Sequence, residues 1–202
     1  MRNLTLHKFL AMLLMTVSSA TLSVAQNVAK NVAKIGTTEY ATLKAAVYDA
    51  TAGQTVVTLI NDVDLTTDDE LEVGKLQNIV LDMNGHSIKG ANANHKNICV
   101  SGKLTLKDSK ENSTGKIYAE TPYQDGVYDK PLVEVINDGE FVMESGHINS
   151  VSAGDHQFVI GAYYNSKVTI NGGTIESGWY AINGTNDEYQ NTTITINGGT
   201  LV

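Results

Sequence analysis

Cysteine, arginine and proline are scarce in this chain of 202 residues. Cys99 is the only cysteine, which excludes an intramolecular disulfide and leaves stability to a hydrophobic core. It lies in the strand-like segment NICVSG without neighbours that would activate a thiolate, so we expect a structural thiol and not a nucleophile. The two prolines both fall within residues 118–131, the longest interruption of the repeat described below.

Arg2 is the only arginine, and the whole chain has 14 Lys and Arg against 22 Asp and Glu, a net charge of −8. Beyond residue 25, 12 lysines remain against 22 acidic residues, a net charge of −10. An acidic chain without arginine is poorly suited to nucleic acids or anionic membranes. It also lacks the guanidinium fork that clamps carboxylates and phosphates. We therefore expect no nucleic-acid partner.

Only the N-terminus has an apolar run of notable length. It has a positive start, an apolar core over residues 9–17 and a small-residue cleavage signal that ends at Ala25. Residues 1–25 are therefore predicted to be a secretory signal peptide, because the run is too short to span a membrane. No later stretch could cross a membrane, so we expect a secreted or cell-surface protein. The polar residues 26–34 are predicted to be a tether.

Residues 35–75 are predicted to form an N-terminal cap with one helix and the first strands. The helix is expected over residues 40–50, with Thr37 or Thr38 capping its start. Strands are expected within residues 35–40 and over residues 55–60. The apolar face of the helix is formed by residues at helical spacing, namely Tyr40, Leu43, Val47 and Ala50.

Residues 76–202 repeat one unit: an alternating strand, a polar turn that ends in Gly, and a second short strand. The clearest copies are SKVTINGGTIESG, from position 166, and TTITINGGTLV at the end of the chain. Pairs of inward residues recur at offsets of 25, 37, 27 and 26 residues, and they are Ile79 and Leu81, Leu104 and Leu106, Phe141 and Met143, Val168 and Ile170, and Ile194 and Ile196. A long period of this kind predicts stacked coils whose strands pair in parallel, with inward aliphatic side chains in rows along the axis.

Three Asn-Gly pairs lie at the expected corners, namely Asn84-Gly85, Asn171-Gly172 and Asn197-Gly198. Both residue types tolerate positive φ, which a sharp corner requires. The structural alternative is that these pairs form tight two-residue hairpins. That alternative explains local segments but not the long period.

These repeats resemble the right-handed parallel β-helix of the pectin-lyase-like group. The segment EYATLKAAVYDATAGQTVVTLINDVDL, together with IVLDMNGHSIKG, is similar to the N-terminal cap and first coils of secreted bacterial β-helix proteins, many of them adhesin-like. The resemblance covers residues 35–202. It implies an all-β parallel solenoid whose first coil is closed by the short helix.

Two functions follow from this resemblance. The group includes lyases that use carboxylate-bound Ca²⁺ with an Arg or Lys base, and hydrolases that use clustered Asp residues. This chain has no arginine beyond residue 25, and its only adjacent Asp pair lies in an early loop, so we lean against an enzyme. The preferred function is a module that binds glycan or protein without catalysis. A polysaccharide lyase or glycosidase is the alternative, which requires carboxylates from successive coils to converge on one groove.

The loop NDVDLTTDDELE holds the only candidate metal ligands, namely Asp62, Asp64, Asp68 and Asp69. Their hard oxygens suit Ca²⁺, but their spacing matches no established calcium loop, and a solvated acidic loop is the other interpretation. We otherwise expect no cofactor.

Exposed aromatic rings suit both sugar faces and protein surfaces. The candidate ligand-binding residues lie in the long segment 118–131 and in the last two coils, and they are Tyr123, Tyr128, Tyr163, Tyr164 and Trp179. Packing against the edge of the core is the alternative role for several of them. Polysaccharide or a surface protein is the expected partner. Because the last repeat has no recognisable cap, we also expect continuation into further coils or end-to-end self-association.

Overall fold

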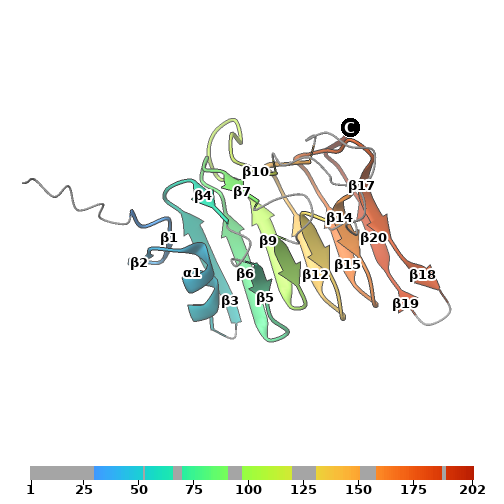
Figure 1. Ribbon diagram of the computed structural model, residues 1–202, viewed down its shortest axis with the longest axis horizontal. Helices are drawn as coiled ribbons and strands as arrows, with labels where there is room; N and C mark the ends of the chain where they lie inside the picture. Colours follow the sequence, from blue (N-terminus) through green and yellow to red (C-terminus); the bar gives the residue numbers. More distant parts are fainter. Residues whose placement is uncertain are drawn as a thin grey trace, which may run out of the picture.

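The computed structural model describes residues 30–51, 53–65, 70–90, 97–119, 131–150, 158–187 and 190–202. In these residues the chain winds as a β-solenoid, in which each turn contributes one strand to each of three sheets that run along the axis (Figure 1). The prediction of an all-β parallel solenoid with one short helix is confirmed.

Sheet A is the largest of the three and has eight strands in the order β2-β1-β3-β6-β9-β12-β15-β20. The pairs from β3 onward are parallel, whereas β1 pairs antiparallel with both β2 and β3. The strands are β1 (Ala33–Ile35), β2 (Thr38–Tyr40), β3 (Gly53–Leu59), β6 (Gln77–Asp82), β9 (Lys103–Lys107), β12 (Glu140–Met143), β15 (Lys167–Ile170) and β20 (Thr193–Ile196).

Sheets B and C complete each turn and are parallel throughout. Sheet B contains β4 (Val63–Asp64), β7 (Ile88–Lys89), β10 (Lys116–Tyr118), β13 (His147–Asn149), β16 (Thr174–Glu176) and β21 (Thr200–Leu201). Sheet C contains β5 (Leu71–Val73), β8 (Ile98–Val100), β11 (Val133–Val135), β14 (Phe158–Ala162) and β17 (Tyr180–Gly184). A small antiparallel pair, β18 (Asn186–Asp187) and β19 (Gln190–Asn191), precedes β20.

The core consists of rows of aliphatic side chains that the parallel register aligns from turn to turn. The predicted inward pairs occupy two rows of sheet A, in which Ile79 pairs with Leu104 and Leu81 with Leu106. Their members are at most 1% exposed from β6 to β15, but Ile194 is 40% and Ile196 53% exposed in β20. The prediction of stacked inward rows is confirmed, and burial ends where no further turn covers the row.

Helix α1 (Leu43–Asp49) lies at the N-terminal end of the solenoid (Figure 1). Leu43, Ala46 and Val47 are buried and join the core, so the apolar face covers the first turn. The predicted boundaries and cap are wrong, because Thr42 is the N-cap residue, whose side chain accepts a hydrogen bond from the Ala45 N–H at 3.1 Å. The helix starts late because residues 38–40 form β2, which pairs with β1. Strand β1 begins two residues before the expected domain boundary at residue 35.

The corners between sheets A and B use glycine, although not always where the Asn-Gly pairs predict. Asn84 and Gly85 both have positive φ, 47° and 81°, as predicted. In the two later pairs the positive φ belongs to the following residue, Gly173 (87°) and Gly199 (91°). A Cβ at Gly173 would lie 2.7 Å from the Gly146 carbonyl oxygen in the preceding turn, so close stacking also requires glycine there.

Buried carboxylates stabilise the same corners. Asp108 is 6% exposed, and its oxygens accept backbone hydrogen bonds from Gly85 (2.8 Å), Lys110 (3.0 Å) and Gly115 (2.6 Å). Such bonds satisfy backbone groups that the tight turns leave without a strand partner. This acidic side chain therefore has a structural role.

The predicted signal peptide and the first residues of the predicted tether lie outside the described part of the chain. Within that part, no helix has the length and apolar character needed to span a membrane.

Candidate functional site

The outward face of sheet C carries an aligned row of polar side chains. Leu71 and Val73 point inward in β5, so the alternation of the strand turns Glu72 outward. The same alternation in β8 and β11 turns Cys99 and Glu134 outward, and the register places Glu72, Cys99 and Glu134 side by side. Three neighbouring turns thus present a carboxylate, a thiol and a second carboxylate in one line.

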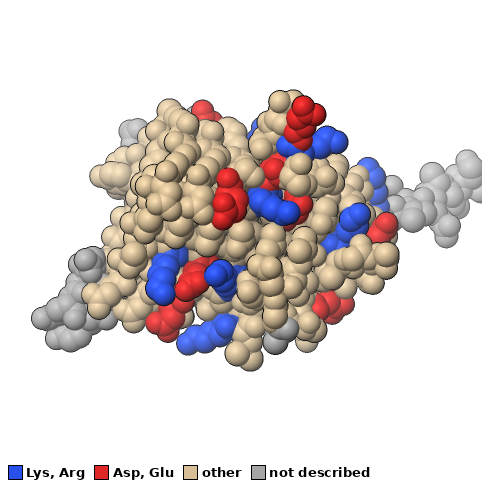
Figure 2. Space-filling view, turned by 180° about the vertical axis from the view of Figure 1, so that it is seen from behind, with Lys and Arg blue, Asp and Glu red and all other residues tan. Residues whose placement is uncertain are grey.

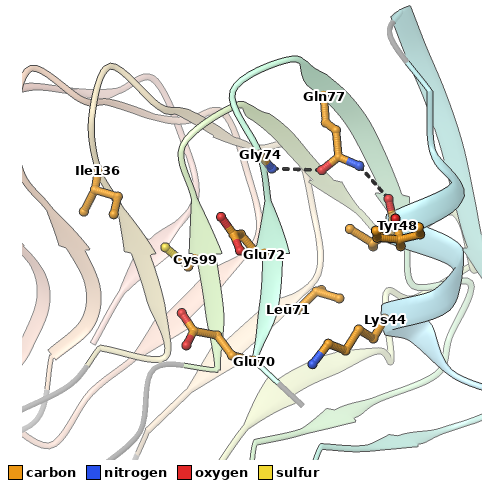
Figure 3. Close-up of a pocket in the computed structure, with 10 residues that line it drawn as sticks. Lys44, Tyr48, Glu70, Leu71, Glu72, Gly74, Gln77, Cys99 and Ile136 are labelled. Atoms are coloured by element: carbon orange, nitrogen blue, oxygen red, sulfur yellow. Dashed lines mark hydrogen bonds between the residues drawn. The ribbon is translucent and has the colours of Figure 1, made fainter. Parts of the chain in front are cut away.

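A groove of about 870 Å³ lies over the first two residues of this row, Glu72 and Cys99 (Figure 3). Helix α1 forms one wall and β5 and β8 form the floor. The lining residues are Lys44, Val47, Tyr48, Glu70, Leu71, Glu72, Gly74, Gln77, Cys99 and Ile136. The volume is in the range of small-molecule sites, and the lining combines an aromatic ring, charged groups and apolar groups.

The helix presents Lys44 and Tyr48 to the groove from its polar side. They are four residues apart, so they lie on one face of α1, away from the buried Leu43 and Ala46. The Tyr48 side chain is 86% exposed, an unusual environment for an aromatic ring of this size. An exposed ring at the rim of a groove is suited to contact a ligand.

Gln77 holds the helix against the solenoid. Its Nε2 donates to the carbonyl oxygens of Val47 at 2.6 Å and Ala50 at 3.1 Å. Its Oε1 accepts from the Gly74 N–H at 2.8 Å, and two of these three bonds are drawn in Figure 3. One side chain therefore satisfies the C-terminal carbonyls of α1 and fixes the groove wall.

Cys99 lies at the floor of the groove and is 5% exposed. Its Sγ lies 4.0 Å from Oε2 of Glu134, as a weak hydrogen-bond donor to that carboxylate. The thiol is free and buried, which is consistent with the structural thiol expected from the sequence.

The structure describes three of the five aromatic residues predicted to bind ligand, and it places them separately. Tyr163 follows β14 and packs over Gly161 on the outward face of sheet C. Tyr164 lies at the next corner with φ 56° and is 53% exposed. Trp179 is 42% exposed and stacks on Phe158 with 5.4 Å between ring centroids. Tyr123 and Tyr128 lie outside the described residues, and a binding role for all five stays a prediction.

The predicted calcium site is described only in part, because Asp68 and Asp69 lie outside the described residues. Oδ1 of Asp62 accepts a hydrogen bond from the Ser87 N–H at 2.9 Å and lies 3.5 Å from His86 Nδ1. Asp64 is exposed in β4. Across the described ranges, no three His, Cys, Asp or Glu side chains come together in a way that would hold a metal ion. The calcium site stays a prediction.

The outward face of sheet A pairs its charges internally. Glu140 lies 3.4 Å from Lys103 Nζ and 3.3 Å from Lys167 Nζ, in the two neighbouring strands. The hydrogen bond from Lys167 is the main cause that lowers the pKa of Glu140, and Lys103 adds to it. These cross-strand pairs support the sheet itself, so sheet C offers the better candidate site.

The groove itself is not predicted by the sequence, although Val47 and Cys99 in its lining have predicted structural roles. From the sequence, Glu70 is only one of the acidic groups that could bind Ca²⁺, and Lys44, Tyr48 and Glu72 have no predicted role. The available signal was Tyr48 itself, because it falls off the apolar face of a short helix that must pack on something. Its position in the same groove as Glu72 depends on how the helix packs on the solenoid, which the periodicity does not specify.

A scan against protein-family models finds no match, and searches of the curated proteins and of the solved structures find no significantly similar protein. The chain is therefore assigned to the β-solenoids by its own parallel sheets and stacked rows.

Proposed function

We propose that this protein is a secreted or surface-displayed β-solenoid module that binds a glycan in the groove between α1 and sheet C. The observation that supports the proposal is the exposed Tyr48 ring at the rim of a groove that also holds Lys44, Glu70 and Glu72. A flat aromatic ring stacks on the apolar face of a sugar. Carboxylates accept hydrogen bonds from sugar hydroxyls, and an ammonium group donates to them.

The charge of the molecule favours a neutral glycan over a polyanionic one. The chain has a net charge of −8, and the groove contributes two carboxylates against one ammonium. Figure 2 shows acidic and basic side chains interspersed on one face, without an extended basic area there. A polyanion would meet net repulsion in this field, whereas neutral hydroxyls would not.

Export is part of the same proposal. It is supported by the positive start, the apolar core of residues 9–17 and the small-residue signal at residues 23–25. N-terminal sequencing of the protein recovered from the culture medium or cell surface tests it. A first residue of Gln26 is expected, and retention in the cytoplasm with an intact N-terminus would contradict it.

A polysaccharide panel tests the binding function. The purified protein is passed over neutral β-glucan, xylan, mannan and galactan and over acidic pectin and alginate, and both retention and the release of new chain ends are measured. We expect retention on a neutral polymer without cleavage, and a loss of about tenfold in affinity for Tyr48→Ala, because a sugar–ring stack is lost.

Tyr180→Ala is the matched control for this experiment, because Tyr180 is also an exposed tyrosine (49%) but lies in the last turn. Wild-type affinity is expected for this variant. If Tyr180→Ala loses binding and Tyr48→Ala does not, the glycan binds at the stacked rings of Phe158, Trp179 and Tyr180, and the groove proposal is wrong.

The alternative function is a polysaccharide lyase or glycosidase. One observation favours it: Glu72 and Glu134 face outward from β5 and β11, with β8 between them. The backbones of β5 and β11 are two strand spacings apart, about 9.6 Å, which is near the upper end of the range that separates the two carboxyl groups of inverting glycosidases. Release of new chain ends by the wild type, abolished in both Glu72→Gln and Glu134→Gln, would replace the binding proposal with this one.

A further inference from the structure

The outward row of sheet C continues beyond Cys99, the last of its residues that lines the groove. The register places Gly161 of β14 next to Glu134, in the same row as Glu72 and Cys99. Glu72, Cys99 and Glu134 each have a side chain in this row, whereas Gly161 of β14 has none. The question is what fills the space above Gly161.

Tyr163 fills that space. A Cβ built on Gly161 would lie 2.8 Å from two ring-end atoms of Tyr163, Cε2 and Oη, and 2.8 Å from Cγ of Pro131. A Cβ at such distances would force the ring end of Tyr163 and Pro131 to shift, so the glycine allows the tyrosine ring to lie on the sheet. The φ of Gly161 is not in the left-handed region, so space and not backbone conformation requires glycine here.

Tyr163 is also a neighbour of a residue that lines the groove. Its N–H donates to the Val135 carbonyl oxygen at 2.8 Å, which places it directly beside Ile136 in the register of β11 and β14. Ile136 lines the groove. Strand β14 is three strand spacings from β5, or about 14 Å along the axis, so Tyr163 lies next to the Ile136 end of the groove, on the side away from α1.

We propose that the groove binds an extended oligosaccharide chain that lies across the strands of sheet C, with Tyr48 as its first aromatic subsite and Tyr163, seated by Gly161, as its second. This inference rests on the proposed glycan-binding function and specifies the length and direction of the ligand. Between the two rings, Glu72 and Glu134 offer acceptors to the hydroxyls of the intervening sugars. A monosaccharide or disaccharide reaches only one ring, so affinity depends on chain length.

The test uses di- to hexasaccharides prepared from whichever polymer in the panel is retained, with Kd measured by calorimetry. For the wild type we expect at least a tenfold gain in affinity between the disaccharide and the longer chains, followed by a plateau. Tyr163→Ala is expected to abolish that gain, which corresponds to about tenfold for the hexasaccharide. Tyr48→Ala is expected to weaken every length.

Two further variants separate the position of the ring from its presence. Gly161→Ala keeps the tyrosine but pushes its ring away, so it is expected to lose the gain with chain length as Tyr163→Ala does. Tyr163→Phe keeps the ring in place and is expected to keep the gain. Gly161→Ala also strains the packing, so thermal unfolding is measured for each variant. If Gly161→Ala does not fold, the comparison of Tyr163→Ala with Tyr163→Phe tests the inference.

Tyr164→Ala is the matched control, because this exposed neighbour lies at the corner and not over Gly161. If it removes the gain and Tyr163→Ala does not, the second subsite is at the corner and the inference is wrong. Affinity that depends on Tyr48 but not on chain length would also overturn the inference and leave the proposed function standing. If no polymer is retained at all, the proposed function fails and the inference fails with it.

Discussion

The two ends of the solenoid are built from the same repeat but differ in what covers them. At the N-terminal end, α1 and the β1–β2 hairpin cover the first turn, and Val57 and Leu59 of β3 are fully buried (Figure 1). In the last turn the inward positions Ile194, Ile196 and Leu201 are 40%, 53% and 41% exposed.

This difference shows that the burial of an inward side chain depends on whether a neighbouring turn covers it, and not on the residue type. Ile170 and Ile196 are the same residue type in register on neighbouring strands, yet one is 0% and the other 53% exposed. Each turn of a solenoid contacts only its neighbours, so a terminal turn has half the packing of an inner one. The last turn is also nearly uncharged, with only Asp187 and Glu188 among residues 177–202, and Figure 2 shows few charged side chains at that end.

The largest expected effect comes from truncating the same side chain in the two environments. Ile170→Ala removes a fully buried side chain from β15, and a loss of about 2–5 kcal/mol in the free energy of unfolding is expected. Ile196→Ala removes the neighbouring, half-exposed side chain, and a loss below about 1 kcal/mol is expected. Urea unfolding of both variants measures the difference.

Equal losses for the two isoleucine variants would contradict this comparison. They would mean that the last turn is covered in solution, for example by a second copy of the chain. Sedimentation of the wild type over a range of concentrations distinguishes that case, because an interface between copies makes stability depend on concentration.

The second prediction concerns a substitution that loosens α1, so that the N-terminal end of the solenoid is less well covered. Gln77→Ala removes the hydrogen bonds to the carbonyls of Val47 and Ala50, at 2.6 and 3.1 Å, and leaves the Gly74 N–H without its side-chain acceptor. A loss of about 1–3 kcal/mol is expected, together with faster amide hydrogen exchange in α1. Exchange measured by mass spectrometry on peptides that cover residues 40–51 reports it.

Gln77→Glu is the matched variant for this effect. It keeps an acceptor for the Gly74 N–H but has no donor for the two helix carbonyls. We therefore expect fast exchange in α1 again, with a loss of stability at least as large as for Gln77→Ala, because the carboxylate would face two carbonyl oxygens at the C-terminal end of the helix. Unchanged exchange in both variants would show that the apolar face of α1 alone holds the helix in place.

Most of the solenoid can be predicted from the sequence, because individual residues of each repeat specify its structure. The alternation of Leu104 and Leu106 or of Val168 and Ile170 specifies which side faces inward, and the long period specifies parallel stacking. The corners were harder, because the positive φ falls on Gly173 and Gly199, one position after the Asn-Gly pair. Two consecutive glycines give no local signal for which of them takes the left-handed conformation.

The candidate site cannot be predicted from the sequence, for a different reason. Tyr48 and Glu72 are 24 positions apart, and only the docking of a seven-residue helix brings them to one groove. Tyr163 can pack over Gly161 only because Gly161 has no side chain. From the strand pattern alone, a glycine at that position predicts only a weaker strand. Sites of this kind arise from contacts between turns, and these are not periodic.

The smallest expected effect concerns charge, which is common in the inner turns and scarce in the last turn. One outward row of sheet A changes from Asp82, Lys107 and Glu144 to the amides Asn171 and Asn197, and Asn197 Nδ2 donates to Asn171 Oδ1 at 2.8 Å. Stability should therefore depend on pH through the inner turns and not through the amide end of the row.

Asp82 is the residue that should carry this pH dependence. Burial opposes its ionisation, but the N–H groups of Ser109 and Asn84, each at 3.0 Å, and Lys107 Nζ at 3.4 Å hold its pKa below the ordinary value of 3.8. A folded-state pKa below the unfolded one stabilises the protein above about pH 4, and this stabilisation is lost as the pH falls through the folded-state value. Asp82→Asn is therefore expected to cost about 1 kcal/mol at pH 7, a difference from wild type that shrinks toward pH 3. Asn171→Ala provides the contrast, because removing an amide should cost the same at both pH values; a loss for Asp82→Asn that is equally independent of pH would show that its hydrogen bonds matter by geometry and not by charge.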